Sequence, residues 1–229
     1  MSCIEPTRRR RLASGAIVAF AASLVVLSPR PASAQTAAET AAARQTQSDD
    51  YTRYELLDPA SASFRIVYEV TATTPGARFF WNPIRKGSIA SNESVSDPTN
   101  GKLLKFLEVP GAEARANGLG NADLDTRYIQ IELPRPVPKE GEIRLLIDKT
   151  YKDEKSYFLE EKTGFIVFSR SLGIKRNSVV LPAGYELVSC NYPSQVVTEP
   201  GSGGARLRMS FMNIGPDAVS YVVKARRLK

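Results

Sequence analysis

An aromatic and cationic segment is the first candidate for chemistry in this chain. Residues 79–87 place Trp81, the single tryptophan, directly before the amide of Asn82, and Arg85 follows three residues later. An aromatic ring beside polar and cationic donors suits the face of a sugar or an extended peptide. The competing interpretation, which the pattern favours, is that Trp81 fills a core and that Pro83 ends an edge strand.

A second polar and cationic segment covers residues 169–177, between two apolar stretches. Its two arginines could present planar guanidinium groups to a carboxylate or a phosphate. The alternative, again favoured by the pattern, is a solvated connection between strands. The two segments together give five candidate ligand-binding residues: Trp81, Asn82, Arg85, Arg170 and Arg176.

The composition excludes several kinds of catalysis. The chain has no histidine, which removes Ser-His-Asp and Cys-His arrangements, imidazole ligands to zinc, and imidazole acid–base chemistry. A hydrolase would instead need a pair of carboxylates, whose separation is set by the fold. Asp123 and Asp125 could offer oxygen ligands to calcium, but one Asp-x-Asp pair equally suits a solvated loop. The sequence therefore predicts no catalytic residue, no metal ligand and no cofactor, with calcium left open.

The amino-terminal residues have the parts of an export signal. Residues 8–11 are four arginines, residues 12–27 are mostly apolar, and residues 32–34 read Ala-Ser-Ala. A basic start, an apolar run too short to span a bilayer and a small-residue ending are typical of a cleaved signal peptide. We expect a signal over residues 1–34 and a periplasmic or secreted mature protein without a transmembrane segment. The arginines fit both ordinary secretion and the twin-arginine route.

Removal of this signal also changes the charge and the cysteine count. Loss of five arginines and one glutamate would lower the formal net charge from +7 to +3. Such a mild excess predicts no nucleic-acid partner. Cys190 would be the one cysteine left, so no disulfide within the mature chain is expected, and we interpret its thiol as a small core group.

Apolar and polar residues alternate along most of the remaining chain. The clearest examples are residues 64–71, 128–133, 143–148 and 206–211, and each predicts a strand with one face in a core and one in water. We predict an all-β protein: a single β-sandwich of about ten to twelve antiparallel strands over residues 51–229, after a disordered lead at 35–50. One short helical turn is expected at 112–117. The predicted core is Phe64, Ile66, Tyr68, Val70, Ile129, Ile131, Ile143, Leu145, Ile147, Val167, Val180, Leu187, Leu207, Phe211, Tyr221 and Val223.

Several segments carry a resemblance to known proteins. Residues 151–153, 173–177 and 181–186 resemble segments of an uncharacterised family of exported bacterial proteins. The order of strands around residues 133–145 is similar to the amino-terminal β-sandwich of gluzincin aminopeptidases, although their zinc motif His-Glu-x-x-His does not occur here. The resemblance implies a sandwich that serves recognition or support, and it supplies no site residue.

These observations lead to two functional hypotheses. The first is an exported, non-catalytic binding or assembly module of the bacterial cell envelope, with an envelope protein or a polysaccharide as its partner. The alternative is a histidine-free secreted hydrolase, directed at glycans and using paired carboxylates.

Overall fold

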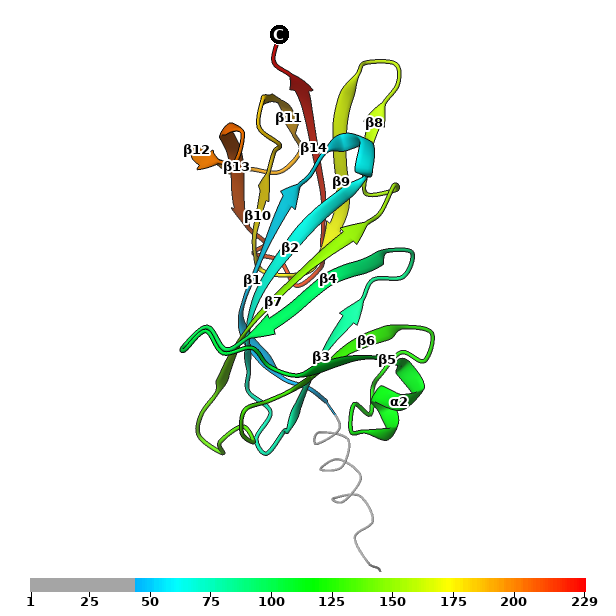
Figure 1. Cartoon of the computed structure of the whole chain (residues 1–229), viewed down its shortest axis with the longest axis vertical. Coiled ribbons are helices and arrows are strands. Elements are labelled where there is room, and N and C mark those ends of the chain that lie inside the picture. The colour runs from blue at the N-terminus through cyan, green and yellow to red at the C-terminus, as the bar shows by residue number, and fades with distance from the viewer. Residues whose placement is uncertain (1–43) are drawn as a thin grey trace, which may run out of the picture.

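The computed structural model describes residues 44–229, so the predicted signal at 1–34 and the first part of the predicted lead lie outside the described residues. The described part contains fourteen strands, one short α-helix and one 3-10 turn. The molecule is elongated, with the carboxyl terminus at one end and the first described residues at the other (Figure 1). The prediction of an all-β protein is confirmed.

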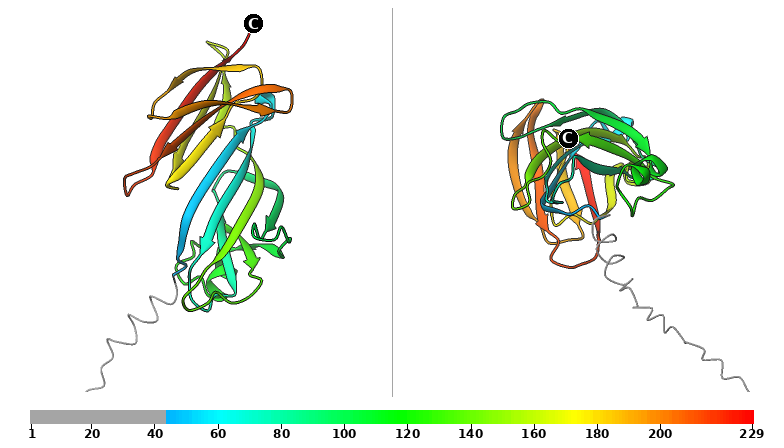
Figure 2. Two further views of the ribbon diagram at one scale, coloured as in Figure 1. Left: turned by 90° about the vertical axis from the view of Figure 1, so that its left-hand side faces the viewer. Right: turned by 90° about the horizontal axis from the view of Figure 1, so that it is seen from below.

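The largest sheet contains seven strands. They are β1 (Gln47–Leu56), β2 (Ser63–Ala72), β4 (Ile89–Ser96), β7 (Ile143–Lys152), β10 (Arg176–Val180), β12 (Gln195–Gly201) and β13 (Gly204–Met212). Their order across the sheet is β12-β13-β10-β1-β2-β7-β4. The long central strands twist along the length of the molecule and connect its two ends (Figure 2). This sheet is therefore the frame on which the remaining elements pack.

Two smaller sheets complete the fold. The four-stranded sheet has the order β11-β14-β9-β8 and contains β8 (Tyr157–Glu160), β9 (Phe165–Leu172), β11 (Tyr185–Cys190) and β14 (Val219–Arg227). The three-stranded sheet has the order β3-β6-β5 and contains β3 (Phe79–Ile84), β5 (Phe106–Pro110) and β6 (Arg127–Glu132). Helix α2 (Gly111–Ala116) directly follows β5, where one helical turn was predicted. The 3-10 turn η1 (Pro59–Ser61) joins β1 to β2.

Both smaller sheets pack on the same face of the seven-stranded sheet. The inward residues of β2 and β7 recur at every second position, from Phe64 to Ala72 and from Ile143 to Tyr151. They form one buried cluster with Phe80 of the three-stranded sheet and Phe168 of the four-stranded sheet. The resulting two layers resemble those of a β-sandwich.

The predicted core is largely confirmed. Fourteen of its sixteen residues are buried, and Leu187 and Leu207 are half-buried against the same cluster. Phe211 stacks on Tyr221 with ring centroids 4.2 Å apart. Cys190 is a half-buried free thiol whose Sγ lies 3.2 Å from the carbonyl oxygen of Tyr192, consistent with its interpretation as a packing group.

Three details of the predicted fold are wrong. The strands number fourteen rather than ten to twelve, because the polar edge strand β4 and the short β8 lack a long alternating pattern. The sheet is not wholly antiparallel, since β1 pairs with β10 in parallel. Residues 47–50, predicted as part of the disordered lead, belong to β1. These residues are polar because most of them are exposed even though their backbone joins the sheet.

Candidate functional site

Strand β3 separates the two side chains that the sequence placed together. Its residues alternate between two faces, so Trp81 and Asn82 point in opposite directions. The Trp81 ring packs in a second buried cluster with Ala114 of α2 and Tyr128 of β6. Asn82 lies on the other face, which is turned to the seven-stranded sheet. The favoured interpretation of Trp81 as a core residue therefore matches its position, and its ring is not an exposed platform for a ligand.

Asn82 meets a buried lysine. Lys149 occupies an inward position of β7, between Ile147 and Tyr151, and its exposed fraction is 4%. Its Nζ donates a hydrogen bond to Oδ1 of Asn82 and lies 4.9 Å from the centre of the Tyr151 ring. Among the described residues, no carboxylate comes within ion-pair distance of this amine. Lys149 is thus a buried amine whose hydrogen-bond partner is a neutral amide.

Burial changes the protonation of Lys149. Desolvation disfavours the charged ammonium and, with the positive charge of Arg170, lowers its pKa to about 7, while Glu93 acts weakly in the opposite direction. The amine therefore changes its charge near neutral pH, which an ordinary exposed lysine does not do.

Arg170 reaches the same region from the four-stranded sheet. Its side chain is 5% exposed, and its Nη1 donates to Oδ2 of Asp153 at 3.1 Å and to Oγ of Ser156 at 3.3 Å. The guanidinium carbon lies 5.2 Å from the ring centre of Phe64 and 5.5 Å from that of Tyr151. Burial raises the pKa of Asp153, but hydrogen bonds from Ser156 and the charge of Arg170 outweigh it and lower this pKa below its ordinary range. Arg170 therefore has an ionised partner.

Arg85 connects the two smaller sheets at the surface. It follows β3 directly, and its backbone N–H donates to the hydroxyl oxygen of Tyr151 at 3.3 Å. Its Nη1 donates to the carbonyl oxygen of Ser171 on β9 at 3.2 Å. The side chain is exposed, so it can present its remaining donors to a molecule that approaches this point.

These residues line a cavity of about 270 Å³ where the two smaller sheets meet over the seven-stranded sheet. We call it the junction cavity. It is lined by Gln45, Gln47, Thr52, Tyr54, Ile66, Tyr68, Trp81, Asn82, Pro83, Arg85, Lys149, Tyr151, Arg170 and Ile174. The Gln45 side chain makes two hydrogen bonds to the backbone of Trp81, which fixes one wall. The lining thus combines three cations with amides, tyrosines and apolar residues.

Four of the five predicted residues line the junction cavity, although the Trp81 ring packs in the second buried cluster, and Arg176 lies outside the cavity. Arg176 donates to the backbone carbonyl oxygens of Asp49 and Asp50 and lines a different depression beside Glu69. Its guanidinium is occupied in tying β10 to the start of β1. The predicted grouping of Arg176 with Arg170 does not occur, because the two belong to strands of different sheets.

Sequence reasoning missed Lys149, although a signal for it exists. Ile143, Leu145 and Ile147 predict an inward face, and two residues further along the same strand the inward position is Lys149. A lysine at a core position is costly in a folded protein, and such positions are often functional.

The possible calcium ligands are engaged elsewhere. Asp123 and Asp125 lie 3.0 and 3.8 Å from Nζ of Lys86. The hydrogen bond from Lys86 lowers the pKa of Asp123. In residues 44–229, no group of three or more His, Cys, Asp or Glu side chains is arranged to hold a metal ion.

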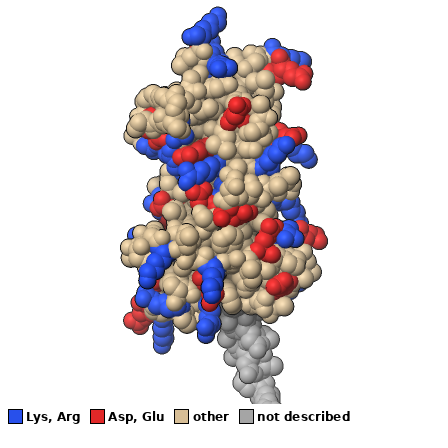
Figure 3. Space-filling model, in the orientation of Figure 1, with Lys and Arg blue, Asp and Glu red and all other residues tan. Residues whose placement is uncertain are grey.

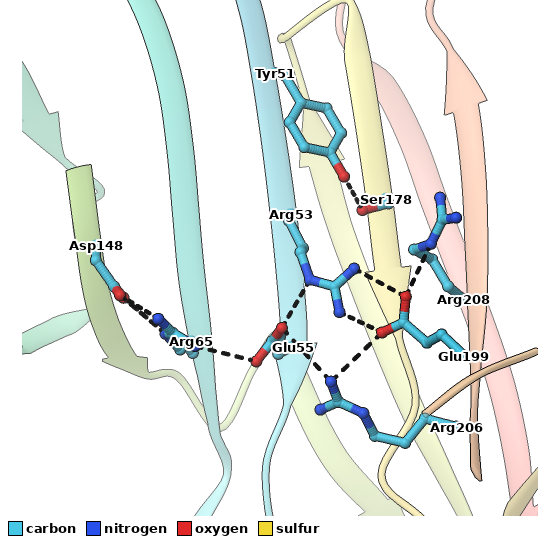
Figure 4. Close-up of polar contacts among 9 residues, drawn as sticks. All are labelled: Tyr51, Arg53, Glu55, Arg65, Asp148, Ser178, Glu199, Arg206 and Arg208. Atoms are coloured by element: carbon cyan, nitrogen blue, oxygen red, sulfur yellow. Dashed lines mark hydrogen bonds and ion pairs between the residues drawn. The ribbon is translucent and has the colours of Figure 1, made fainter. Parts of the chain in front are cut away.

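A second charged cluster lies on the outer face of the seven-stranded sheet (Figure 4). Glu199 of β12 accepts hydrogen bonds from Arg53 and Arg208 and forms an ion pair with Arg206. Glu55 continues this network toward β2 and β7. Its charges are engaged with one another. Positive and negative side chains are also interspersed on the face shown in Figure 3. We interpret the cluster as a support for the edge strand β12.

A larger depression of about 470 Å³ lies on the three-stranded sheet. Phe79, Leu104, Phe106 and Leu107 give it a mainly apolar wall. It contains none of the five predicted residues, so the junction cavity remains the candidate site.

Comparison with known proteins found structural matches of low similarity. No model of a known protein family and no curated protein matches this chain. An M1 zinc metallopeptidase from Deinococcus radiodurans is similar, with a TM-score of 0.46 and 10% identity over 77% of this chain and 41% of that chain. An aminopeptidase N family protein from Idiomarina loihiensis has a TM-score of 0.45 and 13% identity over 77% and 29% of the two chains. The chain thus spans about two fifths or less of the length of these proteins.

Proposed function

We propose that the protein is an exported, non-catalytic binding module of the bacterial cell envelope, and that the junction cavity receives an acidic group of its ligand. One observation carries the proposal: a buried amine, Lys149, lies beside Arg170 and Arg85 in a cavity and has a neutral amide as its hydrogen-bond partner. A carboxylate or phosphate would supply the counter-charge that Asn82 cannot provide.

The cavity chemistry favours an anionic ligand over a neutral one. Arg170 already has Asp153 as its counter-charge, but Lys149 and the exposed Arg85 add positive charge that the lining itself does not neutralise. The tyrosines and Ile66 supply an apolar wall for the part of the ligand that follows the acidic group.

The place of action follows from the amino-terminal sequence. The four arginines at 8–11, the apolar run and the Ala-Ser-Ala ending support export to the periplasm or the medium. The described part of the chain has no helix with the length and apolar character of a membrane span. The ligand would then be an acidic group on an envelope protein or polysaccharide.

A glycan hydrolase is the second candidate, and it needs two carboxylates that flank a glycosidic bond. The described lining of the junction cavity consists of cations, amides, hydroxyls and apolar groups. Such a lining supports binding. Release of new reducing ends from an envelope glycan would instead support the hydrolase. This activity should then be lost when a single carboxylate residue is substituted.

A charge-matched pair of small molecules tests the proposed site. In an NMR titration, glutarate should shift the backbone signals of Asn82 and Lys149 in a saturable manner, and the neutral glutaramide should bind about tenfold more weakly or worse. Lys149→Met and Arg85→Gln should each weaken glutarate binding about tenfold.

The control is Lys152→Met, which removes a lysine from the exposed end of the same strand. Binding of glutarate to this variant should be unchanged. Equal affinities for glutarate and glutaramide, or shifts confined to residues outside the cavity, would refute the proposed site.

A further inference from the structure

We infer that the Lys149 amine is a nucleophile that captures small anionic carbonyl compounds, of the 2-oxo acid class, as imines inside the junction cavity. The inference goes beyond binding, because it assigns covalent chemistry to one atom, Nζ of Lys149. It rests on the position of that atom in a cavity, on its burial and on its single neutral partner, Asn82.

The environment of Lys149 differs from that of other lysines in the described part of the chain. Lys86, Lys152 and Lys224 each form an ion pair with a carboxylate. The Lys149 amine instead lies beside a cation and an aromatic ring. Desolvation beside another cation is a general way in which proteins activate a lysine as a nucleophile.

The charged and titratable groups around Lys149 come from every element packed against it. They are Tyr54 of β1, Tyr68 of β2, Arg85 after β3, Glu93 of β4, Tyr151 of β7 and Arg170 of β9. Burial raises the pKa of Tyr54, Tyr68 and Tyr151, so these rings stay neutral near pH 7. With a pKa of about 7, roughly half of the Lys149 amine is neutral at pH 7, against one in a few thousand for a solvated lysine.

The covalent step is balanced without any added oxidant or reductant. The lone pair of the neutral amine attacks the carbonyl carbon, and a carbinolamine forms. The carbinolamine then loses its oxygen as water, which takes both amine hydrogens, and a C=N bond replaces the C=O bond. No electrons are gained or lost, and hydrolysis reverses the step.

Two features select the class of carbonyl compound. The cavity of about 270 Å³ is at the small end for ligand sites, so it suits a small molecule or one terminal group. Arg85 and Arg170 line it together with Lys149 and would bind a carboxylate placed next to the reacting carbonyl.

Reductive trapping tests the inference in the wild-type protein, so the result does not depend on whether a variant folds. The protein is treated at pH 7 with glyoxylate and cyanoborohydride, and the modified lysines are located by peptide mass spectrometry. We expect Lys149 to be modified at least about tenfold faster than Lys152, because burial increases the neutral fraction of the Lys149 amine and its cavity holds the carboxylate. Modification of Lys149 no faster than that of Lys152 would overturn the inference.

A second reagent and one variant distinguish the reactivity of the Lys149 amine from the selectivity of the cavity for anions. Propionaldehyde, which has no carboxylate, should modify Lys149 more slowly than glyoxylate does. Arg85→Gln should slow the glyoxylate reaction about threefold or more and slow the propionaldehyde reaction by a smaller factor. Equal rates for both reagents would overturn the anionic class. The glutarate titration is independent of this chemistry, so failure of trapping and failure of the proposed binding are distinguishable.

Discussion

Replacement of Lys149 by methionine should raise the free energy of unfolding at pH 7 by about 1 to 4 kcal/mol, the range found when buried ion pairs give way to apolar groups of similar volume. Methionine keeps most of the volume of the lysine stem and removes the amine, whose burial has no compensating carboxylate among the described residues. Urea unfolding of the wild type and of Lys149→Met measures the difference. A gain in stability from loss of a polar group would indicate that Lys149 serves function rather than folding.

The pH dependence of this difference has a definite sign. The folded pKa of Lys149 is about 7 and its ordinary value is 10.5, so the folded state holds fewer protons between these values than the unfolded state. Wild-type stability should therefore rise over this window, and the advantage of Lys149→Met should shrink as pH approaches 10.5. Lys152→Met should change stability by less than about 0.5 kcal/mol. A Lys149→Met variant less stable than the wild type at pH 7 would contradict the account.

Asp153→Ala should have the opposite effect and lower the free energy of unfolding by about 3 to 5 kcal/mol, because it leaves the buried guanidinium of Arg170 without its counter-charge. The alanine also loses the acceptor for the backbone N–H groups of Lys155 and Ser156, which hold the turn between β7 and β8. Asp153→Asn keeps an acceptor and removes the charge, so its loss should be smaller. Asp125→Ala, at an exposed surface position, is the control and should change little.

Low pH should remove part of the stability that the Asp153 carboxylate contributes. The folded pKa of Asp153 lies below its ordinary value of 3.8, so its contribution is present above that pH and is lost as pH falls through the folded pKa. The wild type and Asp153→Asn should therefore converge in stability below about pH 3.8. If Asp153→Ala proves as stable as the wild type at pH 7, the Arg170–Asp153 pair does not organise this side of the cavity.

Much of the fold could be predicted because alternation depends on local sequence. The repeating apolar positions of β2, β6 and β7 identified strands, faces and most core residues, since a buried face needs an apolar side chain at every second position. The edge strand β4 was missed for the same reason: much of it faces water, and Val95 is its one buried side chain.

The arrangement of the site could be predicted only in part. Local composition identified Asn82, Arg85 and Arg170 as unusual, but their meeting depends on the two smaller sheets sharing one face of the larger sheet. Such contacts join residues far apart in sequence and leave no periodic signal. Trp81 and Asn82 are the clearest example. They are adjacent on β3, but the Trp81 side chain packs in a core cluster and the Asn82 side chain contacts Lys149.

The titration of Lys149 shows directly whether its amine is desolvated. Protein labelled with ¹³C at the lysine ε-carbons would be titrated by NMR, and the Lys149 signal would be assigned by its loss in Lys149→Met. We predict a midpoint of about 7 for Lys149, well below the ordinary lysine value of 10.5. A Lys149 midpoint near 10.5 would contradict this prediction, because an amine that stays charged through neutral pH is not the desolvated group that this cavity requires.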